Sequence, residues 1–536
     1  MFGSQSLERD SRIELLLRQS VVVLFGWLAC GGIMRRQWIG LAILFWAALS
    51  TVTSLSAEPY GPATVMAAQE ALTRLGYDVG NADGKWGAKS RKALNELREK
   101  NGLPPADGFA GSSLELIHRL SPGATTLPHP GIMVTDPVER RAFLTLPANT
   151  SVARTSWCPA KVDEVDTLGQ LLARQPVAVV NSTSGPQGYI THGDDWFTPI
   201  MQTLIGAHDL CLVGVDESCK EIVSLMSKWA SADALAPGAK RSQERFEDIS
   251  WIANSFLRNF IFAYADARKL TPVGATEDAA ILDWLKRRID EYHYIRPSGQ
   301  EFGTINYTEA SNHALAHMMP ALAFGALVGD RSMMEGAFDT WRTVLETMRA
   351  DGSLPLEARR GARSLQYTNF QLAQLISTAE VAWSQDIDLY AQAPSAEKTI
   401  PKAVEFLLDA YENFDTVEPY AKANIAAPSD DYSIPYIIQM HVGWLPTYFA
   451  RFGADDNVRR MGTLTIDARI CSSEATSENK LSRADRVCAG NTGEPVSFVS
   501  MLALGGGNVG EAPNYFMGYP AQCLQGQTPS WPVGHP

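Results

Sequence analysis

The chain has no long basic tract. Its 536 residues include 46 lysines and arginines against 59 aspartates and glutamates, a net charge of −13. Nucleic acid binding needs clustered positive charge, so we expect no nucleic acid partner. An acidic polymer would also be repelled at long range, and a site for one must therefore be locally basic. The arginines between Arg342 and Arg363 would supply such a site, although a run of arginines is more often a solvated face.

Several catalytic signatures are also missing. The sequence has no glycine-rich phosphate loop with its lysine and no nucleophile elbow of serine hydrolases. The cysteine spacings do not form a C-x-x-C zinc or redox motif. His313 and His317 stand four residues apart, but Ala314 occupies the position where a metalloprotease helix carries its general-base glutamate. We therefore expect neither a metal nor another cofactor.

No apolar run reaches the roughly 18 uninterrupted residues expected of a membrane-spanning helix. Two shorter runs, Ser20–Met34 and Trp38–Leu49, lie near the N-terminus. Arg35 and Arg36 precede the second run and small residues follow it, as in a secretory signal. We expect residues 1–57 to be a leader, with Met34 as an alternative start, and the protein to be periplasmic or secreted. The alternative is a membrane hairpin or anchor formed by the two runs.

The cysteine content agrees with export. Six cysteines follow Cys30 of the leader, and an even number in an oxidising compartment indicates disulfides. On proximity in the sequence alone, we expect the pairs Cys211–Cys219, Cys471–Cys488 and Cys158–Cys523.

Residues 58–121 are expected to form a compact module. Two amphipathic helical runs, Ala67–Leu75 and Ala88–Glu99, flank a turn rich in glycine and aspartate. The notable residues are Leu75-Gly76-Tyr77, Asp83-Gly84-Lys85-Trp86-Gly87, Gly102-Leu103 and Asp107-Gly108. In this pattern the module resembles the three-helix peptidoglycan-binding module, which implies peptidoglycan as a second partner. The glycines also fix turns and Trp86 fills a small core whatever the module binds.

A long helical region follows a linker or extended arm at residues 122–155. Apolar residues recur at helical spacing, and short turns with glycine, proline or aspartate separate the runs. Antiparallel helix pairs of this length predict a mainly α fold, an α/α toroid or bundle, over residues 156–460. A cysteine-containing extension at 461–536 either closes the toroid or forms a flap. The expected helices are Ser218–Leu235, Arg245–Lys269, Glu277–Tyr294, Thr308–Leu327, Ser332–Arg349, Leu365–Gln385 and Lys402–Phe414.

Two separated polar motifs carry groups suited to cleaving an acidic polysaccharide by β-elimination. One is Asn312-His313, and the other is the stretch Leu354–Leu372 with Arg360, Arg363 and Tyr367. A uronic acid loses its C5 proton only if its carboxylate is neutralised while the carbanion forms. Arginine and amide donors can neutralise that carboxylate, and a phenol or imidazole can move the protons.

The second motif also resembles a sequence pattern of the alginate lyase family of α/α toroid polysaccharide lyases. Its matching residues are Leu354, Pro355, Glu357, Arg359, Arg360, Arg363, Leu365, Tyr367, Asn369 and Phe370. The resemblance runs from about Cys211 to Gly453, including segments Trp229–Leu235 and Gly443–Gly453. The chain departs from the family pattern at Ser311, at Leu315-Ala316 and at Thr368.

The resemblance implies roles for individual residues. Asn312, His313 and Arg360 would hold or neutralise the substrate carboxylate, and Tyr367 would exchange protons. We expect Tyr367 to protonate the leaving oxygen and to act as base, which requires a nearby arginine to favour the phenolate; His313 is the alternative base. The expected substrate-binding residues are Arg363, Arg359, His317 and Tyr307.

Two arrangements of the second motif remain open. On one continuous helix, Arg360, Arg363 and Tyr367 would project from one face, because they stand at helical spacing. If Gly361 instead marks a loop and the helix begins near Ser364, Arg360 approaches Tyr367 from outside the helix.

The favoured function is an exported lyase for mannuronate- or glucuronate-type polymers. The first alternative is a non-catalytic, wall-associated binder of anionic glycans, favoured by the departures at Ser311, Leu315 and Thr368. The second is a peptidoglycan hydrolase.

Overall fold

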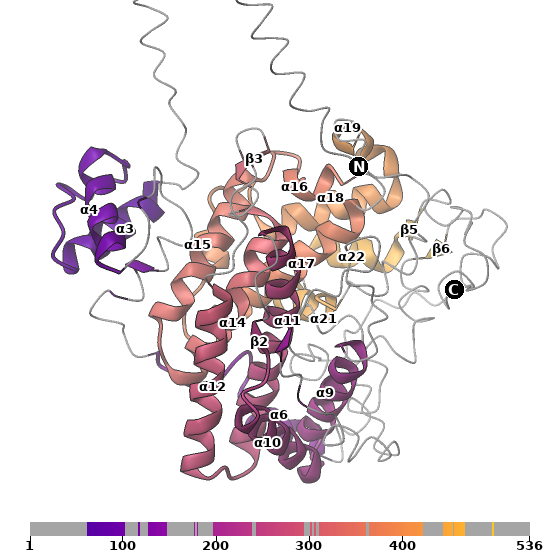
Figure 1. Cartoon of the computed structure of the whole chain (residues 1–536). Helices are drawn as coiled ribbons and strands as arrows, with labels where there is room; N and C mark the ends of the chain where they lie inside the picture. The colour runs from indigo at the N-terminus through magenta and orange to yellow at the C-terminus, as the bar shows by residue number, and fades with distance from the viewer. Residues whose placement is uncertain are drawn as a thin grey trace, which may run out of the picture. The chain divides into compact units, whose positions relative to one another are not determined.

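The structure is a computed structural model of the whole chain (Figure 1). The described part comprises residues 62–101, 105, 116–117, 120, 127–146, 176, 179–180, 197–237, 243–293, 301–302, 305–306, 310–360, 364–421, 443–453, 455–466 and 496–497. The expected leader, Tyr307, Arg363 and the disulfides Cys471–Cys488 and Cys158–Cys523 lie outside it. Within the described part, no helix combines the length and the apolarity needed to cross a membrane.

The N-terminal module contains both predicted helices, α3 (Pro62–Arg74) and α4 (Ala88–Lys100). The buried Gln69 organises the turn between them, since its Nε2 donates to the Lys85 carbonyl oxygen at 3.0 Å and to Ser90 Oγ at 2.9 Å. The Gly84 N–H in turn donates to Gln69 Oε1 at 2.9 Å, and Gly84 has a φ of +72° that favours glycine. Trp86 is buried in the module's core, as predicted.

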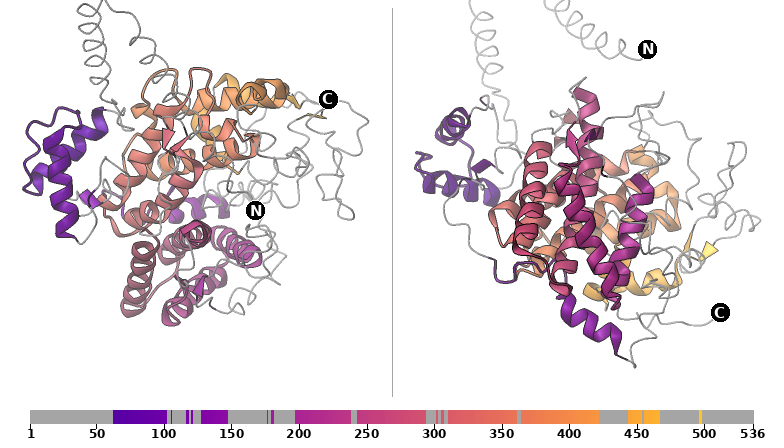
Figure 2. Two further views of the ribbon diagram at one scale, coloured as in Figure 1. Left: turned by 45° about the horizontal axis from the view of Figure 1, so that its top comes forward. Right: turned by 60° about the horizontal axis from the view of Figure 1, so that its bottom comes forward.

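The large helical region is built from helix pairs in two layers. Helices α9, α11, α14 and α17 form one layer, in which α11 packs against α9 and α14, and α14 packs against α17. Helices α10, α12, α15 and α18 each pack on a member of that layer, and the long helices lie side by side in Figures 1 and 2. The pairs are α9 (Phe197–Leu212) with α10 (Asp216–Ser231), α11 (Gln243–Leu270) with α12 (Ala275–His293), α14 (Asn312–Val328) with α15 (Ser332–Thr347), and α17 (Ser364–Trp383) with α18 (Ile400–Glu412).

Burial identifies the inner layer. Almost every residue of α14 and α17 is buried, and a helix buried on all sides belongs to the interior. In contrast, α15 carries half-buried residues such as Arg342 as well as buried ones such as Trp341. Short turns join α9 to α10, α11 to α12 and α14 to α15, so that these neighbours run antiparallel. This is the predicted mainly α fold, an incomplete α/α toroid.

All seven helices predicted in this region are present, with ends that differ by a few residues. The helices α9, α21 (Leu445–Phe452) and α22 (Asp456–Thr463) were not predicted. The remaining elements are short: α16 (Pro355–Ala358), α19 (Glu418–Ala421), η4 (Tyr390–Gln392), η5 (Phe414–Thr416), and the strand pairs β1 (Val179–Val180) with β2 (Ala236–Pro237), β3 (Glu301–Phe302) with β4 (Ile305–Asn306), and β5 (Thr465–Ile466) with β6 (Val496–Ser497).

Residues 127–146 pack on the helical region. The segment 127–134 contains a turn at Gly131 and is bonded to the helices, since the Gly131 N–H donates to the Ala326 carbonyl oxygen at 2.8 Å and Gln385 Nε2 donates to the Ile132 carbonyl oxygen at 2.7 Å. An unpredicted helix, α6 (Pro137–Thr145), follows it. The helix begins there because the Asp136 side chain accepts from the Val138 N–H and Pro137 occupies the first turn.

The disulfide Cys211–Cys219 is confirmed. It joins the end of α9 to the first turn of α10, and the Cα atoms of its two cysteines are 4.8 Å apart. Both cysteines are buried in the main core. The bridge therefore fixes the turn between the first two helices of the toroid.

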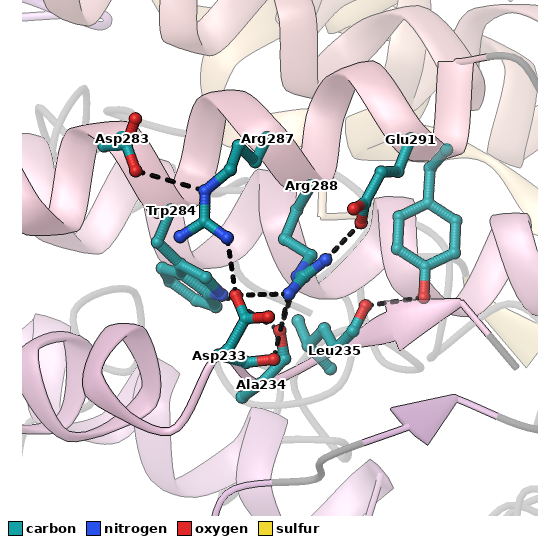
Figure 3. Close-up of polar contacts among 9 residues, drawn as sticks. Asp233, Ala234, Leu235, Asp283, Trp284, Arg287, Arg288 and Glu291 are labelled. Atoms are coloured by element: carbon teal, nitrogen blue, oxygen red, sulfur yellow. Dashed lines mark hydrogen bonds and ion pairs between the residues drawn. The ribbon is translucent and has the colours of Figure 1, made fainter.

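A buried arginine fastens the chain that follows α10 (Figure 3). Asp233 and Leu235 have positive φ values of 48° and 60°, a strained conformation for residues with a side chain. Arg288 of α12, 1% exposed, donates from Nε to the Ala234 carbonyl oxygen at 2.7 Å and from Nη2 to the Asp233 carbonyl oxygen at 2.9 Å. Tyr292 donates to the Leu235 carbonyl oxygen at 2.7 Å. These bonds hold the strained turn against α12.

Replacing Arg288 by Met should destabilise the protein by about 3 kcal/mol, because buried carbonyl oxygens lose their donors. Arg287→Met is the matched control, since Arg287 also pairs with Asp233 but its side chain is 46% exposed. The control should cost less than about 1 kcal/mol. Urea unfolding followed by tryptophan fluorescence measures both changes in the free energy of unfolding. Equal losses of stability in the two variants would contradict the conclusion that Arg288 holds the strained turn.

Candidate active site

The first polar motif lies at the start of an inner helix. Helix α14 begins at Asn312 because Ser311 is its N-cap, with the Ser311 side chain accepting from the Ala314 N–H. Asn312 and His313 therefore occupy the first turn of α14. Asn312 is buried and His313 is half-buried.

The short helix α16 holds Asn312 through a buried carboxylate. Glu357 Oε1 accepts from the Asn312 backbone N–H at 2.9 Å, and Glu357 Oε2 accepts from Asn312 Nδ2 at 2.8 Å. Glu357 is 2% exposed. Burial raises the pKa of its carboxyl group, whereas the bonds from Asn312 and the charges of Arg360 and Arg359 lower it. The two motifs, 45 residues apart in the chain, therefore meet here.

Arg360 and Tyr367 form the next contact. The Arg360 Cζ atom lies 4.0 Å from the centroid of the Tyr367 ring, a cation–π distance. Helix α17 begins at Ser364, whose Oγ donates to the Ala358 carbonyl oxygen at 2.7 Å. Arg360 therefore approaches Tyr367 from the turn before the helix, the second of the two predicted arrangements. Tyr367 is partly buried, and its ring packs edge to face on Phe370 at 5.7 Å.

His313 is a neutral imidazole at neutral pH. Burial lowers the pKa of His313 to about 4, and the nearby positive charge of Arg360 adds to this effect. Because a neutral imidazole can accept or donate a proton, His313 keeps both roles predicted for it.

The four predicted catalytic residues therefore form one contiguous group. Glu357 links Asn312 to the turn that carries Arg360, whose backbone N–H donates to the Glu357 carbonyl oxygen at 3.0 Å. The Arg360 guanidinium in turn lies over the Tyr367 ring, and its charge contributes to the lowered pKa of His313. The group contains a cation, an amide, a neutral imidazole and a phenol, the combination that elimination from a uronate needs.

The predicted substrate-binding residues have different outcomes. Arg359 is half-buried, and its charge acts on Glu357. His317 is buried one turn along α14 from His313, and its Nδ1 accepts from Asn254 Nδ2 of α11 at 2.8 Å. Tyr307 and Arg363 lie outside the described residues, so their roles stay predictions. No three histidine, cysteine, aspartate or glutamate residues of the described part gather as metal ligands.

Asn369 of the second motif has a supporting role. Its Nδ2 donates to the Tyr411 hydroxyl of α18 at 2.6 Å, and its Oδ1 accepts from Trp444 Nε1 at 3.0 Å. All three residues are buried. Asn369 thus fixes α17 against α18 and against the segment that precedes α21.

Sequence reasoning missed the role of Glu357. In the sequence, Glu357 is only one residue of the second motif. A glutamate is common in the first turn of a helix that starts with proline, so its presence there does not indicate a function. The available signal was the position of Glu357 three residues before Arg360, which keeps the two on one turn.

We expect His313 to stay neutral until the pH falls to about 4, because its pKa is lowered from the ordinary histidine pKa of 6.5. The unfolded chain takes up the proton more readily, so this group favours folding above pH 6.5, and its contribution is lost as the pH falls from 6.5 towards 4. NMR titration of the histidine ring measures the value. Arg360→Met should raise the pKa of His313 only in part, because burial is the larger cause of its lowering. An ordinary histidine pKa in the unmodified protein would contradict the burial of His313.

Comparison with known proteins confirms both predicted resemblances. Residues 215–417 match the family described as alginate lyase, and residues 62–114 match the putative peptidoglycan binding domain. A polysaccharide lyase of Stenotrophomonas maltophilia is 31% identical over 94 residues, which cover 18% of this chain and 28% of that protein. An alginate lyase of Pseudomonas syringae pv. tomato is 21% identical over 183 residues, which cover 33% of this chain and 45% of that protein. The matches thus span less than half the length of these two relatives.

Among solved structures, alginate lyase A1-III from Sphingomonas species A1 is 22% identical, with a TM-score of 0.46 over 63% of this chain and 92% of that chain. An alginate lyase from Bacteroides ovatus is 16% identical, with a TM-score of 0.41 over 60% of this chain and 93% of that chain. By these matches, the chain carries a region similar to the alginate lyase family at residues 215–417, which includes Asn312, His313, Arg360 and Tyr367, and a region similar to the putative peptidoglycan binding domain precedes it.

Proposed function

We propose that this protein is an exported polysaccharide lyase that cleaves a mannuronate- or glucuronate-type polymer by β-elimination. The observation that carries the proposal is the contact of the Arg360 guanidinium with the Tyr367 ring, on a turn that Glu357 joins to Asn312. The charge of Arg360 also helps to keep His313 neutral. The match of residues 215–417 to the alginate lyase family supports it.

Neutralising the substrate carboxylate is the first requirement. Arg360 supplies a permanent positive charge, and Asn312 and His313 supply hydrogen-bonding groups beside it. As the C5 proton leaves, negative charge spreads onto the carboxylate, and donors already in place stabilise that charge without reorganising. The carboxylate would therefore lie against Arg360 and Asn312.

Proton transfer is the second requirement. Tyr367 takes the C5 proton, the electron pair forms a double bond between C4 and C5, and the C4–O bond breaks. The leaving oxygen then receives a proton from Tyr367. His313 is the alternative base, and its neutral imidazole can accept the C5 proton. The products are a 4,5-unsaturated sugar at the new non-reducing end and a shortened polymer, with no redox cofactor involved.

Stereochemistry limits the choice of substrate. β-D-Mannuronate and β-D-glucuronate differ at C2 but share the arrangement at C4 and C5, where the leaving oxygen and the C5 proton lie on the same side of the ring. One tyrosine can therefore serve both sugars. The site residues act on the carboxylate and on C5, so they admit either polymer.

The departures from the family pattern give little support to the non-catalytic alternative. Ser311 and Leu315 are 0% exposed and Thr368 is 2% exposed. Ser311 caps α14, and Leu315 packs in the main core. Ser311 and Leu315 therefore have roles in the interior of the fold, and the candidate catalytic groups of Asn312, His313, Arg360 and Tyr367 are retained.

Tyr367→Phe should lower turnover by about 10²–10⁴-fold while sparing glycan binding, because it removes the proton-transferring hydroxyl and keeps the ring. Purified protein is incubated with mannuronan, glucuronan or guluronan, and the ultraviolet absorbance of unsaturated uronates is followed. Tyr390→Phe is the matched control, since Tyr390 is also a partly buried tyrosine but donates to Glu380.

The outcome separates the candidate functions. Binding of a polyuronate without ultraviolet-absorbing product from the unmodified protein would favour the non-catalytic binder. Release of muropeptides that stops on chelation would favour a peptidoglycan hydrolase. Equal turnover by the Tyr367→Phe and Tyr390→Phe variants would remove Tyr367 from the mechanism.

We also propose that the protein is periplasmic or secreted and that its N-terminal module binds peptidoglycan. The full-length chain, expressed in a bacterial host, should appear outside the cytoplasm and should sediment with purified peptidoglycan. Excess polyuronate should not release it, because the module and the lyase-like region have separate cores. Gln69→Leu, which removes the bonds that hold the turn at Gly84 and Lys85, should weaken sedimentation and leave turnover unchanged. Cytoplasmic retention, or release by polyuronate, would contradict this assignment.

A further inference from the structure

Glu357 is a buried acid that connects the two motifs of the candidate active site. It lies on α16, accepts two hydrogen bonds from Asn312 of α14, and stands three residues before Arg360. We propose that Glu357 is a positioning residue for the elimination reaction, which fixes the side-chain amide of Asn312 for the substrate carboxylate. This inference rests on the proposed lyase function.

The geometry fixes the amide at two points. The backbone N–H and the side-chain Nδ2 of Asn312 both donate to one carboxylate, at 2.9 and 2.8 Å. A single bond would leave the amide free to rotate, whereas two bonds from neighbouring donors set the plane of the side chain. Nδ2 has a second hydrogen, and no described residue accepts it. That hydrogen is the group available to a uronate.

Glu357 differs from a buried acid that only stabilises the fold. Glu380 of α17 is equally buried at 2% exposure, but its charge is neutralised directly. Arg451 donates to both Glu380 oxygens at 2.9 Å, and Tyr390 donates to Oε1 at 2.7 Å. Within the described residues, Glu357 has no such ion pair and directs both oxygens at Asn312. Burying a carboxylate without an ion pair costs free energy. We infer that this cost is offset by the function of Glu357 in positioning Asn312.

The neighbouring charges suit this role. Arg360 and Arg359 act on Glu357 electrostatically without occupying its oxygens. The Arg360 guanidinium lies at the Tyr367 ring, whereas both Glu357 oxygens accept from Asn312. Glu357 consequently holds the amide donor while the arginine supplies the positive charge, and the two functions do not compete for the same atoms.

The first test compares two buried glutamates. Glu357→Gln places an amide against the Asn312 donors, so that at least one bond is lost. We expect kcat on the preferred polyuronate to fall about 10²-fold, as for a small misplacement of a catalytic group, while KM changes by less than about threefold. Glu380→Gln, the matched control, should lower the thermal unfolding temperature and leave kcat within about twofold. Glu357→Asp keeps the charge but is too short for both bonds, and its kcat should be intermediate.

The second test asks whether Glu357 acts through Asn312. Asn312→Ala should lower kcat by about 10²–10³-fold, the usual cost of removing one preorganised donor. If Glu357 only positions Asn312, the double variant Asn312→Ala, Glu357→Gln should be no slower than Asn312→Ala alone. It should also unfold at a higher temperature than Asn312→Ala, because that single variant leaves one oxygen of the buried carboxylate without its donor.

The results distinguish this inference from the function on which it rests. No unsaturated product from the unmodified protein would overturn the lyase proposal, and this inference with it. An active unmodified protein whose Glu357→Gln variant retains kcat would overturn the positioning role alone. Multiplicative losses in the double variant would do the same, because they would show that Glu357 acts independently of Asn312. Should Glu357→Gln fail to fold, the Glu357→Asp kcat decides in its place, and a value equal to that of the unmodified protein overturns the role.

Discussion

Two hydrogen bonds from Asn312 to the buried carboxylate of Glu357 join the parts of the candidate active site. They connect the first turn of α14 to the turn that carries Arg360, and Arg360 in turn lies over Tyr367 of α17. Without this connection, the two motifs would be separate helix ends. Burial strengthens the connection, because two donors removed from water have no alternative partner.

The need to pair buried polar groups also applies to the rest of the inner layer. Helices α14 and α17 are buried on almost all sides, so each polar side chain on them needs a partner inside the protein. Asn254 meets this need for His317, and Tyr411 and Trp444 meet it for Asn369. The polar groups that hold the helices together thus lie on the same helices, α14 and α17, as the polar groups of the site. The residues that support the site are therefore part of the core.

Helical periodicity predicted most of this fold, and its failures have physical reasons. Amphipathic runs such as Ser332–Arg349 gave nearly correct helices, because their apolar side faces one neighbour. Helix α9 was missed since its residues are largely apolar on every side and show no such contrast. Helix α6 carried a readable signal, Asp136 followed by Pro137, but the prolines and glycines before it favoured a linker. Of the expected disulfides, only Cys211–Cys219 falls within the described residues, and it forms as proximity suggested.

The sequence by itself determined most of the helices, the module and the candidate site residues Asn312, His313, Arg360 and Tyr367, because residue type, spacing and motif order are local properties. It left open whether Arg360 shares a helix with Tyr367, and the start of α17 at Ser364 settled that question. Only the tertiary structure brings Glu357 into hydrogen-bonding contact with Asn312 and lowers the pKa of His313 by burial. Hydrogen bonding across 45 residues and the pKa of a buried imidazole depend on which helices pack together, and no local pattern encodes that packing.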